Sequence, residues 1–379
     1  METRFGKFRL VKHIGGGRLS QVFKVAPLHL DDEESHVALK RVTPSMIGEP
    51  AYVQLVVREA KVLTSLSHEH LCRCLELGVV DGSAFLTMEL VDGCTLRAVL
   101  RRLSMQQARM PRTAIVGQGY QLAVVLEYLH RQTDHKLVHL DLSPQNVMIS
   151  RAGELKLIDF GLARYLDGHN PPPLGGKIAG TVGYMSPEQA SGGEVDERAD
   201  QYGLGVLLWE MLANRRLFRG NNAETWRRMR AGEVPPADAV FPSMPLKLTH
   251  TIYRMLSPNP ADRFSHMGAV AAALKGCASS PRRGQNMLAE VVEGMMYDPD
   301  FDPFDSRLKA PTPTPEEQDI PAGEAGDEDD GYAELSIQVD HGQGSPTSQV
   351  RTVIPLGGAA PDSPFLETIP EAPPTDSRE

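Results

Sequence analysis

The fold is decided by His139-Leu140-Asp141-Leu142-Ser143-Pro144-Gln145-Asn146, which is followed by Leu157-Ile158-Asp159-Phe160-Gly161. In both stretches a few polar side chains interrupt apolar runs. Asp141, Asn146 and Asp159 offer hard oxygen ligands, the type that Mg²⁺ prefers when it also binds substrate phosphates. Asp141 is in addition the best candidate for a general base. Each residue alone fits a turn or a cap, but the set in this order predicts a phosphate-binding metal site.

Two earlier stretches add phosphate-binding chemistry. Gly15-Gly16-Gly17 joins two predicted strands, where glycines let backbone N–H groups approach a phosphate, although hairpins also use glycine. No predicted helix follows, so the turn fits neither a dinucleotide fingerprint nor a P-loop. Lys40 ends the strand stretch Val37-Ala38-Leu39-Lys40, and a lysine among apolar neighbours requires an anion. Glu59, in the helical stretch that follows, is its candidate partner, with a surface salt bridge as the alternative.

The pattern of apolar residues divides the chain near residue 92. Residues 5–91 contain five β-length runs and one amphipathic helical stretch, whereas residues 94–275 are mainly helical. The runs are Phe8–Ile14, Val22–Ala26, Val37–Val42, Cys74–Val80 and Ala84–Leu90, and the main helical stretches are Ala51–Leu66, Thr113–His130 and Tyr202–Leu212. We therefore expect an α+β fold of two lobes, with a ligand site in a cleft between them.

In this order the motifs resemble those of the eukaryotic-like protein kinase family, in its bacterial serine/threonine form. The motifs are the glycine-rich loop, V-A-L-K, the helix glutamate, H-L-D-x-x-x-x-N, D-F-G, and Ser186-Pro187-Glu188 in place of A-P-E. Asp200 and Arg263 stand where the family has further fixed positions. The resemblance covers residues 8–275 and implies a kinase domain with an N-lobe over 8–91 and a C-lobe over 94–275.

The resemblance implies transfer of the γ-phosphoryl group of MgATP to serine or threonine hydroxyls of proteins. Lys40 would hold the α- and β-phosphates, positioned by Glu59. Asp159 and Asn146 would bind Mg²⁺, with Mn²⁺ as the alternative metal. Asp141 would accept the proton of the substrate hydroxyl.

The resemblance also assigns the residues around the nucleotide and the activation segment. Met88 would be the gatekeeper, Glu89 to Gly93 the hinge, and Thr181 would bond the catalytic loop and shape the acceptor site. Glu188 and Arg263 would form a buried ion pair. The implied nucleotide-binding residues are Ile14, Gly15, Gly16, Gly17, Val22, Ala38, Lys40, Met88, Glu89, Val91, Met148 and Asp159.

Three residues depart from the family pattern. Ser20 replaces the third glycine of the loop, which a small residue tolerates. Ser143 replaces a lysine that contacts the transferred phosphate, and a serine offers only a neutral hydrogen bond, so we expect a slower enzyme. Leu140 replaces the arginine that binds a phosphorylated activation loop in many kinases. The alternatives are a pseudokinase that binds nucleotide or partners without efficient transfer, and a small-molecule kinase, which the stretch 180–188 disfavours.

The activation segment lacks the usual phosphorylation sites. Between Leu162 and Gly180 the chain has no Ser or Thr, and Tyr165 is the only hydroxyl. The arginine that would bind a loop phosphate is replaced by Leu140, and the Ser or Thr that would carry the phosphate is missing. The two departures therefore agree with each other. We therefore predict that the segment is active without loop phosphorylation, stiffened by Pro171-Pro172-Pro173. An ordinary loop of chance composition is the alternative.

The charge and the cysteine content indicate which ligands and which cellular compartment suit the protein. The 379 residues carry a net charge of −10, and residues 276–379 contribute 6 Lys/Arg against 21 Asp/Glu. The body is therefore basic and suited to anionic ligands, while the acidic tail argues against nucleic acid as a partner. No apolar run predicts a membrane span and the start lacks a signal-peptide pattern. The four cysteines, Cys72, Cys74, Cys94 and Cys277, are too few for a disulfide framework. We interpret Cys72-Arg73-Cys74 as small residues in a strand, in a reducing cytoplasm.

The composition also changes after residue 275. Residues 276–309 form a linker in which Asn286–Met296 can form a short helix. Residues 310–379 are rich in Pro, Gly and acidic residues, and we expect them to be disordered. The acidic run 327–330 could dock onto the basic body and slow substrate access, and the tail could bind a regulatory partner. A solvated linker without a role is the alternative.

Overall fold

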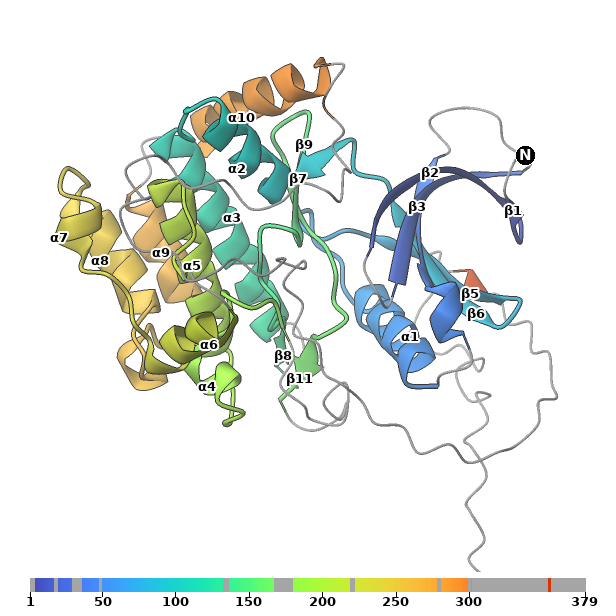
Figure 1. Cartoon of the computed structure of the whole chain (residues 1–379), viewed down its shortest axis with the longest axis horizontal. Coiled ribbons are helices and arrows are strands. Elements are labelled where there is room, and N and C mark those ends of the chain that lie inside the picture. The colour runs from blue at the N-terminus through green and yellow to red at the C-terminus, as the bar shows by residue number, and fades with distance from the viewer. Residues whose placement is uncertain are drawn as a thin grey trace, which may run out of the picture.

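The computed structural model describes residues 4–16, 20–28, 36–47, 50–131, 136–166, 180–218, 222–277, 281–298, 301 and 354–355. Gly17 lies outside the described residues, as do most of the segment 162–180 and the acidic run 327–330. The described part forms a curled sheet with one helix at one end and a helical body at the other (Figure 1). This is the two-lobed α+β fold that the sequence predicts. No helix in the described segments is both long and apolar enough to cross a membrane.

The N-lobe is an antiparallel sheet in the order β1-β2-β3-β4-β6-β5-β12, with α1 packed against β4, β5 and β6. The five predicted runs are all strands, with ends that differ by a few residues. The elements are β1 (Arg4–Phe5), β2 (Phe8–Gly16), β3 (Ser20–Pro27), β4 (Val37–Val42), α1 (Pro50–Thr64), β5 (Cys74–Val80) and β6 (Ser83–Glu89). Helical spacing predicts that Val53, Val56, Ala60 and Leu63 share one face of α1; the last three are buried and Val53 is partly buried against the same core.

One expectation for the N-lobe is wrong. We placed both Cys72 and Cys74 in a strand, but Cys72 precedes β5. Its backbone N–H donates to the carbonyl of Leu157 in the C-lobe at 3.1 Å. Cys72 therefore lies in the connection from α1 to β5, where β10 of the C-lobe satisfies its backbone N–H.

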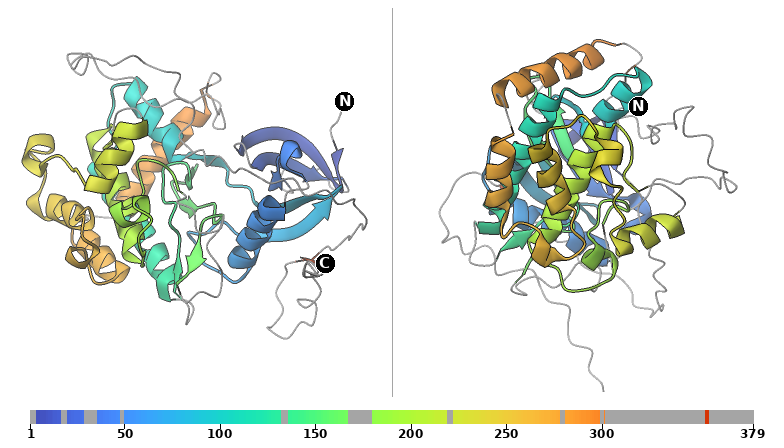
Figure 2. Two further views of the ribbon diagram at one scale, coloured as in Figure 1. Left: turned by 60° about the horizontal axis from the view of Figure 1, so that its bottom comes forward. Right: turned by 90° about the vertical axis from the view of Figure 1, so that its left-hand side faces the viewer.

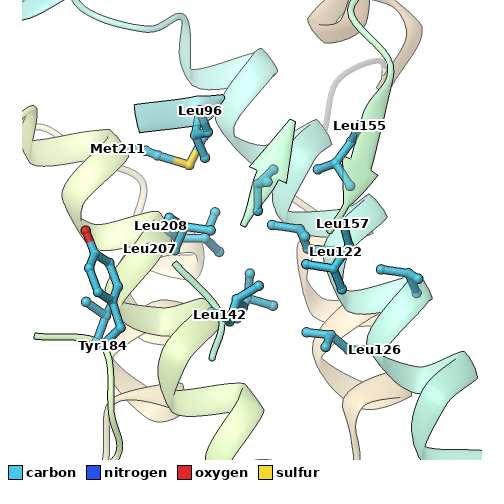
Figure 3. Close-up of a cluster of buried hydrophobic side chains, with 14 of the residues drawn as sticks. Leu96, Leu122, Leu126, Leu142, Leu155, Leu157, Tyr184, Leu207, Leu208 and Met211 are labelled. Carbon is cyan, nitrogen blue, oxygen red and sulfur yellow. The ribbon is translucent and has the colours of Figure 1, made fainter. Parts of the chain in front are cut away.

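The C-lobe is built around α3 (Arg112–Arg131) and α5 (Arg198–Ala213), which pack against each other. A Cβ at Gly119 of α3 would come within 2.8 Å of the Leu208 side chain, so glycine allows the close approach. Leucines from both helices and from the short strands meet in one core (Figure 3). The other helices are α2 (Leu96–Met105), α4 (Pro187–Ala190), α6 (Asn222–Ala231), α7 (Ala237–Val240), α8 (Leu246–Met255), α9 (Met267–Lys275) and α10 (Pro281–Met296).

Two small sheets carry the loops of interest. β7 (Gly93–Thr95), β9 (Val147–Ser150) and β10 (Leu155–Leu157) form one, and β8 (Leu137–Val138) and β11 (Arg164–Tyr165) form the other. The 139–146 stretch lies between β8 and β9, and Asp159 follows β10. Both polar stretches therefore follow short buried strands of the C-lobe, and Asp159 contacts Lys40 on the sheet of the N-lobe.

Helix α10 contains the Asn286–Met296 stretch and begins five residues earlier. It lies across α2 and α3 (Figures 1 and 2). Leu288, Val292 and Met295 are buried, and a Cβ at Gly284 would come within 2.4 Å of the Thr113 carbonyl oxygen. The helix is thus packed into the C-lobe through an apolar face and a close backbone contact.

A two-residue strand occurs in the tail that we expected to be disordered. In β12 (Ile354–Pro355), Ile354 pairs with Leu77 and Pro355 with Glu76 of β5. Without β12, β5 would be the edge of the sheet, and an edge strand presents unpaired N–H and C=O groups to which another segment can add. The rest of residues 310–379 lies outside the described part.

Candidate active site

Lys40, Glu59 and Asp159 meet between the two lobes. Lys40 lies on β4, Glu59 on α1, and Asp159 in the loop after β10. Lys40 Nζ donates to Glu59 Oε2 at 2.7 Å and to Asp159 Oδ1 at 3.0 Å. Lys40 is 8% exposed and Glu59 2%, so the ammonium and its first partner are both buried. One cation thus joins a strand, a helix and a loop that are far apart in the sequence.

Lys40, Glu59 and Asp159 shift one another's pKa values. Burial opposes the charged form of Lys40, but the carboxylates of Asp159 and Glu59 outweigh it and raise its pKa. Burial also opposes the ionised form of Asp159, and the charge of Lys40 outweighs it and lowers the pKa of that carboxyl. Burial raises the pKa of Glu59, and the nearby charge of Asp159 adds to the shift. Lys40 and Asp159 are therefore held charged at neutral pH.

A second cluster surrounds Asp141. The Thr181 backbone N–H and hydroxyl donate to Asp141 Oδ1 at 2.8 and 2.7 Å. Asn146 Nδ2 donates to Asp141 Oδ2 at 2.9 Å and to the Asp141 carbonyl at 2.7 Å. Burial raises the pKa of Asp141, and the hydrogen bond from Thr181 opposes that shift. The carboxylate is thus fixed in orientation at both oxygens while its proton affinity is increased.

The two clusters are neighbours. The Ile158 N–H donates to the Asn146 carbonyl at 2.9 Å, which ties the Asp141 loop to the residue before Asp159. Asp159 also contributes to the raised pKa of Asp141, as expected of two carboxylates within electrostatic reach. The structure therefore brings together all five residues predicted to carry the chemistry, and Thr181 with them.

Asp200 supports this loop in a way that the sequence analysis did not foresee. The N–H groups of His139 and Leu140 donate to its two carboxylate oxygens at 2.9 and 2.8 Å, and His130 Nε2 lies 2.8 Å from Oδ2. Leu140 has φ 65°, a left-handed conformation that costs energy for a branched side chain. The paired N–H bonds stabilise that turn. An acidic residue at the start of an otherwise apolar helix was the available signal.

The predicted ion pair near the activation segment is present. Arg263 Nη1 and Nη2 donate to Glu188 Oε1 and Oε2 at 2.7 and 2.8 Å, and the Arg263 side chain is fully buried. Three backbone carbonyls accept from the same guanidinium, those of Ser257, Pro258 and Arg198. This pair joins α4 to the loop before α9.

The residues predicted to surround a nucleotide lie on neighbouring strands. Ala38 pairs with Met88, and Val22 with Lys40. Ala38 and Met88 are buried, while Ile14 and Val22 are partly buried against the same core. Met148 lies on β9, half-buried, and Val91 lies buried in the connection from β6 to β7.

Two of these positions carry local constraints. Gly15 pairs with Val22, and Gly16 has φ 119°, where a Cβ would meet the Ser20 carbonyl oxygen at 2.3 Å. The turn therefore requires glycine at Gly16. The Glu89 carboxylate accepts a hydrogen bond from Lys156 Nζ at 2.8 Å. The predicted hinge role of Glu89 therefore falls to its backbone.

The donor set fits a nucleotide with a divalent ion. The pKa of Asp159 is lowered and its side chain is 38% exposed, and Asn146, whose backbone carbonyl accepts from the Ile158 N–H, offers an amide oxygen. In the described segments no trio of His, Cys, Asp and Glu side chains is arranged to hold a metal ion. Two protein oxygens that need further ligands suit Mg²⁺, which takes the remainder from phosphates and water.

Comparison with known proteins agrees with this geometry. Residues 8–274 match the family described as "Protein kinase domain". The chain is 29% identical over 290 residues to "Tyrosine-protein kinase MasK" of Myxococcus xanthus (strain DK1622), covering 75% of this chain and 45% of that protein. It is 31% identical to "Serine/threonine-protein kinase Pkn1" of Myxococcus xanthus, covering 72% and 38%. It is 33% identical to "Serine/threonine-protein kinase PknL" of Mycobacterium tuberculosis (strain ATCC 25618 / H37Rv), covering 70% and 64%. The chain thus spans less than two thirds of each of these relatives.

Proposed function

Because this chain belongs to the protein kinase family, we propose that it transfers the γ-phosphoryl group of ATP to serine or threonine hydroxyls of protein substrates. The observation that carries the proposal is the meeting of Lys40 and Asp159 beside the Asp141–Thr181 hydrogen bonds. Serine or threonine as acceptor rests on the Thr181 contact and on the names of the relatives Pkn1 and PknL. The name of MasK makes tyrosine the competing acceptor.

The residues divide into those that hold the nucleotide and those that act on the acceptor. Lys40, positioned by Glu59, contacts the α- and β-phosphates. Asp159 and Asn146 would hold Mg²⁺, which would neutralise charge on the phosphates. Mn²⁺ fits the same oxygen donors. The adenine ring would lie among the residues predicted for it: Ile14, Val22, Ala38, Met88, Glu89, Val91 and Met148.

Asp141 acts on the acceptor. The substrate hydroxyl oxygen forms a bond to the γ-phosphorus as the bond to the β–γ bridging oxygen breaks, and the hydroxyl proton passes to Asp141. The bonds from Thr181 and Asn146 keep the carboxylate oriented during this step. Positioning of this kind accounts for most of the catalysis in phosphoryl transfer.

We further propose that transfer does not depend on activation-loop phosphorylation. The turn at Leu140 is held by side chains of the C-lobe and not by a phosphate, because its N–H donates to the Asp200 carboxylate and its carbonyl accepts from Gln189 Nε2 at 2.8 Å. Residues 167–179 of the loop lie outside the described part. Mass spectrometry of active protein tests the proposal, and an essential phosphate within 162–180 would overturn it.

Cysteine chemistry supports a reducing, cytoplasmic site of action as part of the proposal. Burial raises the pKa of the Cys74 thiol to about 11 and that of Cys94 to about 12, so these thiols are unreactive. All four cysteines are free. A regulatory partner for the tail stays a prediction of the sequence.

The test is transfer of radiolabel from γ-labelled ATP to a protein substrate, with phosphoamino-acid analysis. Wild type is expected to label serine or threonine, and Asp141→Asn and Lys40→Met are expected to lose the label. Label that persists in both variants would reveal a contaminating kinase. Bound nucleotide without label in any sample would establish the pseudokinase alternative, which no contact in the described site favours.

A further inference from the structure

A hollow beside the catalytic loop is lined by four arginines. It lies between α2, the residues that follow Asp141, and the loop after α5. Its walls include Arg97, Arg101, Ser143, Tyr184, Arg215 and Arg216. Ser143 follows Asp141 by two residues, so their Cα atoms are at most about 7 Å apart. The hollow therefore lies within about two to three extended peptide residues of Asp141.

The hollow has a strong excess of positive charge. Glu210 is the carboxylate in its described lining, against four guanidinium groups. Glu210 already accepts from the Tyr184 hydroxyl at 2.6 Å and from the Leu217 N–H at 2.9 Å. Arg216 lies over the Tyr184 ring at 5.7 Å from its centroid. Tyr184 belongs to the buried core drawn in Figure 3, so the Arg216 guanidinium lies at the edge of that core.

Two polar atoms in the wall have no hydrogen-bond partner among the described residues. These are Nη1 of Arg101 and Oγ of Ser143, and both are buried. Ser143 as a whole is 0% exposed. A buried donor without an acceptor is costly, so such atoms call for a ligand. A ligand with anionic oxygens in the hollow would supply the acceptors that these two atoms lack.

The chain holds the arginines at this place despite their repulsion. Arg97 and Arg101 are four residues apart on α2 and therefore share one face. Asn214 ends α5 in the left-handed conformation, φ 53°, and its side chain donates to the Ala108 carbonyl at 3.3 Å. That turn directs Arg215 and Arg216 to the hollow. Guanidinium groups match the planar geometry of carboxylates and the oxygens of phosphates.

We infer that this hollow binds an acidic side chain of the protein substrate, a few positions from the phosphorylated hydroxyl. The inference rests on the proposed function and adds a substrate class to it. The ligand is an Asp or Glu carboxylate or a phosphorylated residue, since both present anionic oxygens to the same donors.

The test uses the full chain and peptides with one serine acceptor. Glutamate, alanine or arginine is placed in turn at each of the four positions on either side, and phosphoserine at the best one. Glutamate at one or more positions is expected to raise kcat/KM about tenfold over alanine, mainly through KM. The gain is expected to shrink as salt rises, because the charges are half-exposed. Comparing glutamate with phosphoserine identifies the source of the anion.

Charge reversal assigns the effect to the hollow. Arg101→Glu is expected to lose the preference for glutamate and to favour arginine at the same position, with the KM for ATP unchanged. The matched control, Arg109→Glu, changes an exposed arginine just after α2 and is expected to keep the wild-type preference. Thermal unfolding of both variants checks that they fold. Arg101→Gln, which removes charge without reversing it, serves if Arg101→Glu does not fold.

Two outcomes would overturn the inference. One is equal turnover of glutamate and alanine peptides by wild type. The other is a change in Arg101→Glu that is the same for every peptide. Binding of fluorescent peptides, measured by polarisation with a non-hydrolysable ATP analogue, is scored in parallel. If no peptide is phosphorylated, the proposed function fails, and the binding preference still decides whether the hollow selects acidic peptides.

Discussion

Thr181 donates its hydroxyl to Oδ1 of Asp141 at 2.7 Å, and its backbone N–H reaches the same oxygen at 2.8 Å. These bonds favour the ionised carboxylate, whereas burial raises the pKa of Asp141 above the ordinary range of an aspartate. The activation segment therefore helps to set the protonation state of the proposed base. A change at Thr181 is therefore expected to alter the pH dependence of transfer, which the loss of a purely structural contact would not do.

Replacing Thr181 is expected to shift the pH profile of kcat/KM. Only ionised Asp141 can accept a proton, so kcat/KM falls as the pH drops through its raised pKa. Thr181→Val removes the hydroxyl bond that lowers this pKa, so the acid limb of the profile is expected to move to higher pH. Thr181→Ser keeps a hydroxyl and is expected to keep the wild-type limb. A Thr181→Val enzyme that is slower at every pH by one factor, with an unmoved limb, would contradict the account.

The Glu188–Arg263 pair predicts a large loss of stability. Glu188→Gln keeps the shape but leaves a fully buried guanidinium without its counter-charge, which costs about 3–5 kcal/mol. The control is Glu224→Gln, which removes charge from a pair of similar length, 2.8 Å, whose Arg227 side chain is exposed. Chemical denaturation measures both. Equal destabilisation of the two variants would show that burial of the pair is not what matters.

Helix α10 predicts that the folded unit extends beyond the family match at residue 274. Leu288→Ala opens a cavity under a side chain that is 0% exposed and is expected to cost about 2–5 kcal/mol. Glu290→Ala, on the exposed side of the same helix, is expected to leave stability close to wild type. The melting temperature of the full chain distinguishes them. A melting temperature unchanged by Leu288→Ala would mean that α10 does not pack as the structure has it.

Much of the proposed chemistry could be predicted from residue type and order. A lysine in an apolar strand requires an anion, and this argument already pointed to Glu59, which lies 2.7 Å from Lys40. Period-2 and helical patterns predicted the five strands of the N-lobe and the buried face of α1 to within a few residues.

The remaining contacts depend on how distant segments meet, which no local pattern contains. Asp200 looks like a helix-start residue in the sequence, yet it binds backbone N–H groups of the catalytic loop. The left-handed turn at Leu140 is also invisible, because leucine rarely adopts it. Similarly, the arginines of α2 and of the loop after α5 are far apart in the chain and meet only through the packing of the C-lobe.

The central claim is that Asp141 acts on the acceptor hydroxyl while Lys40 and Asp159 hold the nucleotide. Single-turnover transfer and ATP affinity, measured together on Asp141→Asn, test it most directly. The account predicts ATP affinity within a factor of two or so of wild type and a transfer rate lower by about 10²–10⁴-fold. A transfer rate close to that of wild type at saturating ATP would contradict it.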